Sequence, residues 1–146
     1  MMAEMTIGEV AKQAGVNTST VRYYDRLGLL PKPRRVHKHR RFDPSVLHWL
    51  TLIDFAQKAG LTLAEIQRLF HGFEPETSPA ERWQVVAEQK LPQIDALIAR
   101  AQKMKRLLEQ TQQCQCARLE DCASPNQDVC GPQNVTEINV SIYEEL

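Results

Sequence analysis

The sequence predicts a mainly α-helical protein, with a head of short helices followed by one long helix and a cysteine-rich loop. Through most of residues 6–113, apolar residues recur at steps of three and four, which is the period of an amphipathic helix. Gly15, Gly28 and Gly60 stand where successive apolar patterns stop, as glycines at helix ends do. No apolar run approaches the roughly 20 residues that cross a membrane, so we expect no membrane partner.

The first two helices are predicted near residues 6–14 and 18–27. Thr6 is a good N-cap for the first, and Val21 lies on the apolar face of the second. Two short helices joined by a tight Ala-Gly-Val-Asn turn indicate a helix-turn-helix. The second helix of this motif lies in the major groove of DNA, with its first residues facing the bases.

A strongly basic segment, PKPRRVHKHRRF at Pro31–Phe42, follows this helix pair and favours a loop or a small two-stranded wing. Residues 1–50 carry nine Lys or Arg against four Asp or Glu. This balance indicates a polyanionic partner, with a solvated basic surface as the alternative. We expect DNA contacts from the second helix and the basic segment: Thr18, Ser19, Arg22, Tyr23, Tyr24, Arg34, Arg35, Lys38, Arg40 and Arg41. One of the two tyrosines is expected to pack into the core instead.

A second helix pair is predicted after the basic segment. Asp43-Pro44 offers an N-cap followed by proline at the first helical position. The apolar face that follows it ends at Gly60. Thr62 and Glu65 then have the spacing of a capping box, which predicts the start of a fourth helix.

The longest helix is predicted from Ser78 to about Gln113, because a capping-box pattern opens this stretch and it contains no glycine. Pro92 removes a backbone hydrogen bond to Glu88, which predicts a kink. The apolar residues recur like the seam of a coiled coil at Leu91, Ile94, Ile98, Ala101 and Leu108. Such a stripe needs a partner, so we expect a homodimer through this helix. Packing onto the chain's own head is the alternative.

All four cysteines lie within CQCARLEDCASPNQDVC, at Cys114–Cys130. The first residues lack the basic-then-apolar build of a signal peptide, so we expect a cytoplasmic protein. In that compartment clustered cysteines more often form a metal or redox site than structural disulfides. The candidate ligands, for Zn, Cu(I) or a similar thiophilic ion, are Cys114, Cys116, Cys122 and Cys130. A thiol-redox switch without metal is the alternative.

The sequence does not favour an enzyme, because it has no Gly-rich phosphate loop and no Ser/His arrangement of a catalytic site. A zinc-stapled interaction module without a DNA role would leave the basic head unexplained. Beyond the cysteines, Ile138, Val140 and Ile142 alternate with polar residues and predict a short strand, to which we assign no function.

Two stretches, TIGEVAKQAGVNTSTVRYYDRLGLLP and RRFDPSVLHWLTLIDFAQKAGLTLAEIQRLF, resemble the MerR family of bacterial transcription regulators. The resemblance covers roughly residues 5–122. Where the family's wing often turns through Asn-Gly, this chain has His37-Lys38-His39. The resemblance implies a winged helix-turn-helix DNA-binding domain at 5–73, an antiparallel coiled-coil dimerisation helix at 78–113, an effector-binding cysteine loop at 114–130 and a C-terminal tail at 131–146.

The resemblance also implies a mechanism. In this family a homodimer binds an operator within a promoter whose spacer is too long for RNA polymerase. A signal at the end of the dimer helix changes the angle between the two heads. The DNA is distorted and the promoter elements are realigned, so RNA polymerase is an indirect partner.

The effector remains open between two branches of the family. Cys114 and Cys122 resemble the ligand pair of the copper-sensing branch, which also has serine at the position of Ser78. Cys116 would add a third thiolate for a divalent ion. Cys-x-Cys-x5-Cys also resembles part of the loop of the redox sensor SoxR, which holds a [2Fe–2S] cluster. Thr111 stands where SoxR has its first ligand, so Cys130 would have to supply the fourth thiolate.

Overall fold

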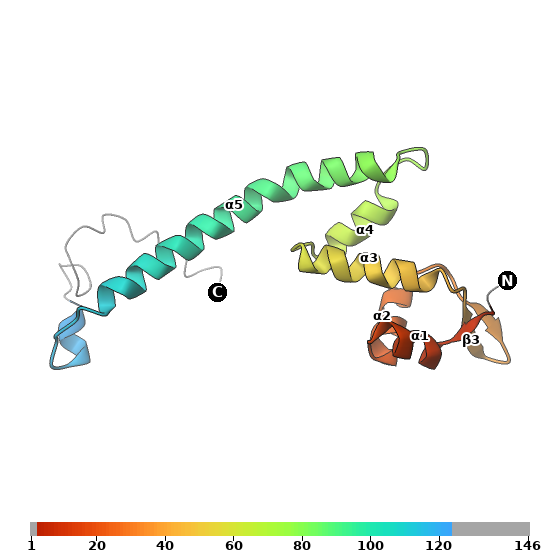
Figure 1. Ribbon diagram of the computed structural model, residues 1–146, viewed down its shortest axis with the longest axis horizontal. Coiled ribbons are helices and arrows are strands. Elements are labelled where there is room, and N and C mark those ends of the chain that lie inside the picture. Colours follow the sequence, from red (N-terminus) through yellow and green to blue (C-terminus); the bar gives the residue numbers. More distant parts are fainter. Residues whose placement is uncertain (1–2, 124–146) are drawn as a thin grey trace. The chain divides into compact units, whose positions relative to one another are not determined.

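The computed structural model describes residues 3–123 of the chain. The chain divides into two compact units, residues 1–90 and 91–146, and the helix α5 (Pro79–Thr111) contributes residues to both. The described residues are mainly helical, with one small antiparallel sheet (Figure 1). The fold class predicted from the sequence is therefore confirmed. Among the described residues, no helix is long and apolar enough to cross a membrane.

The helix-turn-helix consists of α1 (Ile7–Ala14) and α2 (Thr18–Arg26). Thr6 caps α1 as predicted: its Oγ1 accepts from the Glu9 backbone N–H at 3.2 Å, and the Glu9 carboxylate accepts from the Thr6 N–H at 2.9 Å. Gly15 ends α1 with φ at +69°, a left-handed conformation that glycine adopts without a steric cost. The turn is thus fixed by local sequence at both ends of α1.

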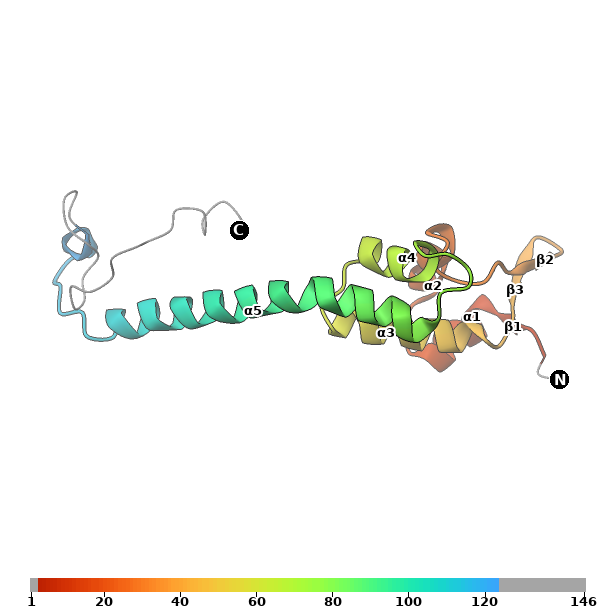
Figure 2. The same ribbon diagram turned by 90° about the horizontal axis from the view of Figure 1, so that it is seen from above.

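A three-stranded antiparallel sheet lies beside α1 in the head (Figure 2). Its strands are β1 (Met5–Thr6), β2 (Arg34–Val36) and β3 (His39–Phe42), in the order β1-β3-β2. Of the two predicted alternatives for the basic segment, a loop or a two-stranded wing, the structure has the wing. The sequence did not predict β1, which pairs Met5 with Phe42 and adds a third strand.

The second helix pair consists of α3 (Val46–Lys58) and α4 (Leu63–His71). The predicted start of α3 at Asp43-Pro44 is wrong, because the N-cap is Ser45 and α3 begins at Val46. The Asp43 carboxylate instead accepts from the Ser45 backbone N–H at 2.8 Å, and this hydrogen bond lowers the pKa of Asp43. Asp43 therefore stabilises the turn that precedes α3.

The capping boxes of the next two helices are confirmed. At α4, the Thr62 hydroxyl accepts from the Glu65 N–H at 3.2 Å, and the Glu65 carboxylate accepts from the Thr62 N–H at 3.0 Å. At α5, Ser78 and Glu81 exchange the same two bonds at 3.2 and 3.1 Å. Each pair satisfies two backbone N–H groups that the helix start would otherwise leave without a partner.

One hydrophobic core joins the helices and the sheet of the first unit. Apolar side chains from α1, α2, β3, α3 and α4 are buried together, and Val86 of α5 joins them. The largest fully buried side chains among them are Val10, Val21, Leu29, Phe42, Val46, Ile53 and Ile66. The helix α2, the wing and the first turns of α5 therefore pack on one shared core.

The second unit contains the rest of α5 and the start of the cysteine loop. α5 continues through Pro92 and ends at Thr111, two residues before the predicted end, and a short 3-10 helix η1 (Leu119–Cys122) follows. Several apolar side chains of this part of α5 are exposed: Leu91, Leu97, Ile98, Met104 and Leu108. Cys130 and the predicted strand at 138–142 lie outside the described residues.

Candidate nucleic-acid interface and metal centre

The first turns of α2 present several of the predicted DNA-contacting side chains to solvent. Ser19 and Arg22 are exposed, and Thr18 is half-buried at the start of the helix. Tyr23 is 45% exposed. Tyr24 packs against the core instead, and its hydroxyl donates to Gln57 Oε1 on α3 at 3.2 Å. One tyrosine of the pair is therefore a packing residue, as expected, and Tyr23 is the one available to a ligand.

The basic side chains of the wing divide into exposed and internally paired groups. Arg35 and Lys38 are exposed. Arg34 lies 2.9 Å from Glu4 Oε2 at the surface. Arg40 Nε donates to Asp25 Oδ2 of α2 at 3.1 Å, and both side chains are mostly shielded from solvent. Arg40 therefore connects the wing to α2, a role that the sequence reasoning missed.

The tip of the wing is a two-residue turn between paired strands. Val36 pairs with His39, and both intervening residues, His37 and Lys38, have positive φ, at 51° and 69°. Two-residue hairpins of this kind favour Asn-Gly, because both positions need a positive φ, which asparagine tolerates and glycine adopts without strain, whereas most other side chains are strained there. The tight turn places the exposed residues His37 and Lys38 together at the tip of the wing.

Three of the four cysteines converge just beyond the end of α5. The sulfur atoms of Cys114, Cys116 and Cys122 all lie within 4.8 Å of one another, and those of Cys114 and Cys122 are 3.7 Å apart. The Cys114 N–H donates to the Thr111 carbonyl at 3.1 Å, which keeps Cys114 on the last turn of the helix. The helix η1 then brings Cys122 back toward it.

The spacing of the sulfur atoms suits a thiophilic ion. Two thiolates on a tetrahedral zinc ion stand about 3.8 Å apart, because each Zn–S bond is about 2.3 Å long. The 3.7 Å between Cys114 and Cys122 matches this value, and Cys116 is close enough to be a third ligand. Soft thiolate donors select Zn, Cu(I) and similar ions over Mg or Ca. Cys130, the fourth predicted ligand, lies outside the described residues.

Comparison with known proteins identifies the family. Residues 5–72 match the family model for the MerR HTH family regulatory protein, and residues 47–111 match the model for MerR, DNA binding. The mercuric resistance operon regulatory protein of Serratia marcescens is 31% identical over 110 residues, which cover 75% of each chain. A SoxR homolog of Chromobacterium violaceum, an HTH-type transcriptional activator, is 27% identical over 136 residues, which cover 88% of this chain and 92% of that protein.

A solved structure shares the fold. The transcription regulator PbrR691 from Ralstonia metallidurans CH34, solved in complex with lead(II), is 28% identical with a TM-score of 0.67. The match covers 81% of this chain and 94% of that one. Together with the two family models and the identity to the Serratia regulator, this similarity shows that the chain belongs to the MerR family of DNA-binding transcription regulators.

Proposed function

We propose that this regulator binds promoter DNA as a homodimer and activates transcription when a thiophilic metal ion binds Cys114, Cys116 and Cys122. The convergence of three sulfur atoms within 4.8 Å is the observation that carries the proposal. The names of two relatives support it, since one regulates a mercuric resistance operon and the other was solved with lead(II). A bound ion would join the thiolates of one loop and reduce their mutual repulsion.

The DNA-binding role falls to α2 and the wing. Thr18, Ser19 and Arg22 occupy the part of a recognition helix that faces base edges. Tyr23, Arg34, Arg35, Lys38 and Arg41 are proposed to meet phosphates, which fix position without choosing sequence. Arg40 keeps this assignment as well, although its guanidinium already binds Asp25.

The homodimer is proposed to form through α5. The exposed side chains of Leu91, Ile98 and Leu108 belong to the coiled-coil seam that the sequence predicts. A second copy of the same helix would cover them. We assign residues 78–113 to this dimerisation helix, 5–73 to the DNA-binding domain and 114–130 to the effector loop.

Activation is proposed to act through the DNA rather than through catalysis. Metal binding at the loop would change the relation between the two heads of the dimer, and the operator would be bent and untwisted. RNA polymerase then meets realigned promoter elements, so its involvement is indirect. The protein is accordingly proposed to act in the cytoplasm and to have no enzymatic activity.

A [2Fe–2S] cluster is the second candidate effector, favoured by the similarity to a SoxR homolog over 88% of the chain. Such a cluster takes four cysteine ligands, of which the described residues supply three. Cys130 would have to be the fourth. The two candidates therefore differ in whether Cys130 is required.

Anaerobic purification, followed by elemental analysis and a visible absorption spectrum of the same sample, tests the effector. The proposal expects a colourless protein that contains zinc or copper, or that takes up either ion with loss of titratable thiols. Cys114→Ser and Cys122→Ser should each lower metal affinity at least 100-fold and abolish promoter activation, while operator binding stays within about threefold of wild type.

Ala123→Ser is the matched control, because it places a hydroxyl beside Cys122 without removing a thiol. A red-brown protein with about two irons per chain, which also needs Cys130, would replace the metal proposal by the cluster. Full promoter activation in Cys114→Ser would exclude this loop as the sensor in either form.

A further inference from the structure

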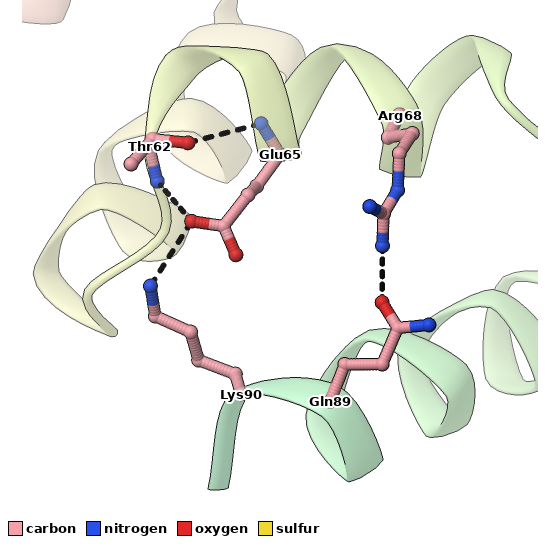
Figure 3. Close-up of polar contacts among 5 residues, drawn as sticks. All are labelled: Thr62, Glu65, Arg68, Gln89 and Lys90. Atoms are coloured by element: carbon pink, nitrogen blue, oxygen red, sulfur yellow. Dashed lines mark hydrogen bonds and ion pairs between the residues drawn. The ribbon is translucent and has the colours of Figure 1, made fainter. Parts of the chain in front are cut away.

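The helix α4 is bound on one face to the first part of α5 (Figure 3). Lys90 Nζ donates to Glu65 Oε1 at 3.0 Å, and the Arg68 guanidinium donates to the Gln89 side-chain oxygen. Glu65 and Arg68 are three positions apart, so they project from the same face of α4. Two adjacent residues of α5 therefore hold two residues of α4.

A second face of α4 is bound to the end of the recognition helix. Gln67 Nε2 donates to the Leu27 carbonyl at 2.9 Å, and His71 Nε2 lies 2.7 Å from the Gly28 carbonyl. Gln67 and His71 are one helical turn apart on α4. Leu27 is the C-cap of α2, so its carbonyl is among those that a helix end leaves without an intrahelical partner, and Gly28 is the next residue of the chain. α4 is thus connected by side chains to α5 and to α2 at the same time.

The contact with α5 is partly shielded from water. The Lys90 side chain is 13% exposed and that of Glu65 is 26% exposed, in contrast to the surface pair Lys58–Asp54, at 76% and 63%. Exposed pairs contribute little, whereas removing one member of a shielded pair leaves the other without its partner. The Lys90–Glu65 pair should therefore contribute more to holding α4 against α5 than the Lys58–Asp54 pair contributes to the stability of α3.

The position of this contact along α5 is informative. Pro92 follows Lys90 by two residues and has no N–H, so the Glu88 carbonyl lacks its helical hydrogen bond. The helix is held to α4 directly before its weakest turn. If the turn before the proline were loose, a movement of the later part of α5 would be absorbed by bending at Pro92. Because that turn is fixed to α4, the movement can reach the head.

We propose that Lys90, with Gln89, is a positioning residue that transmits a change in α5 to α2. The change reaches α4 through the contacts of Glu65 and Arg68 on one of its faces. It reaches α2 through the contacts of Gln67 and His71 on the other face of α4. The inference rests on the proposed function, because it concerns how the metal signal reaches the DNA. Lys90 contacts neither the thiols nor the proposed DNA-binding side chains. Its loss should uncouple two sites that each still bind their ligand.

The test compares Lys90→Met, Lys90→Arg and Lys58→Met in the full-length dimer. Three quantities are measured for each: affinity for zinc(II) and copper(I) added separately, affinity of the metal-free protein for a duplex selected by the wild type, and the metal-induced change in energy transfer between dyes at the two duplex ends. Lys90→Met should keep both affinities within about threefold and reduce the change in energy transfer at least fivefold.

Lys90→Arg keeps the positive charge and should recover at least half of the wild-type change. Lys58→Met removes a lysine from an exposed pair and should behave as wild type. If Lys90→Met folds poorly, Glu65→Gln replaces it, because a glutamine oxygen can still accept from the Thr62 N–H. An undiminished metal response in Lys90→Met, or in Glu65→Gln, overturns the inference, as does a Lys90→Arg protein that fails like Lys90→Met.

A failure of the proposed function looks different. If the wild type itself selects no duplex, or shows no response to either ion, the regulator proposal falls and this inference falls with it. A responsive wild type with an equally responsive Lys90→Met removes only the role of Lys90.

Discussion

Lys90 Nζ and the Thr62 backbone N–H donate to the same carboxylate oxygen of Glu65, each at 3.0 Å (Figure 3). Glu65 therefore belongs to a helix cap and to a contact between helices at once. The Thr62 backbone hydrogen bond is the main cause that lowers the pKa of Glu65, burial opposes it, and Lys90 lowers it further. A single carboxylate thus connects the start of α4 to α5.

This arrangement predicts a pH-dependent stability. Because the folded-state pKa of Glu65 is depressed below its ordinary value of 4.5, its contribution is present above that value and is lost as the pH falls through the folded-state pKa. Glu65→Gln should lower the free energy of unfolding by about 1 kcal/mol near neutral pH, with the difference from wild type shrinking below pH 4.5. Urea unfolding across this range measures it, with the exposed Glu76→Gln as control. If the difference in unfolding free energy between wild type and Glu65→Gln stays the same below pH 4.5, the ionised Glu65 carboxylate is not its cause.

The wing turn predicts a stabilising substitution. Lys38 has φ at +69°, where a residue with a Cβ is strained and glycine is not, so Lys38→Gly should raise the free energy of unfolding by about 0.5–1 kcal/mol. The same variant should weaken binding to all DNA sequences alike, because a proposed phosphate contact is lost. Thermal unfolding and DNA titration are measured on one sample. His39→Gly, within β3, should destabilise instead, and equal effects of the two glycines would refute the turn argument.

The exposed side chains of the head predict two kinds of DNA-binding variant. Arg22→Ala should cost about 1–3 kcal/mol on a selected operator, with relaxed base choice at one position, and little on random DNA. Arg35→Ala should weaken both kinds of DNA equally and reduce the salt slope by about 1. Titrations at several salt concentrations distinguish them. Equal losses on both DNAs for Arg22→Ala would remove it from base recognition.

Arg40→Ala is expected to give a mixed result. It removes a proposed phosphate contact and also breaks the shielded pair with Asp25 of α2. Binding to all sequences should fall, and the unfolding temperature should fall with it, whereas Arg35→Ala leaves stability unchanged. Calorimetry on the two variants separates the structural part of the Arg40 effect.

The exposed stripe of α5 predicts how the dimer can be broken. Leu108 is 67% exposed in the single chain, and a charge there would be buried against the second copy. Leu108→Asp should weaken dimerisation at least 100-fold, because an unpaired charge in an apolar seam costs several kcal/mol. Analytical ultracentrifugation measures it. Gln102→Asp adds the same charge off the seam and should leave a dimer, so dissociation of both variants would count against the proposed seam.

The features predicted well from the sequence are those encoded by neighbouring residues. The capping boxes at Thr62 and Ser78 depend on pairs three positions apart, so their spacing alone identifies them. The cysteine cluster is equally local. Its cysteines are close in the chain, and a helix end followed by η1 is enough to bring them together.

The features that the sequence did not predict depend on distant pairing. β1 has two residues, too few for a strand pattern, and exists because Met5 pairs with Phe42 across the head. The helix α3 begins at Val46, two residues later than predicted, and Ser45 at its N-cap makes no side-chain capping bond. The Asp43 carboxylate accepts from the Ser45 N–H in the turn before the helix, a geometry that the local sequence does not distinguish from an N-cap. The pairing of Lys90 with Glu65 spans 25 positions, and neither residue carries a local signal of it.

The closeness of the thiols along the chain has a consequence for how such a sensor can change. Cys114 and Cys122 are only eight positions apart, so closing the loop between them costs little chain entropy. The metal site can therefore form without help from the folded core of the head, and heating that unfolds the head should not by itself release the ion. Substitutions within this short loop can then alter which ion is recognised while the surface that reads DNA stays as it is.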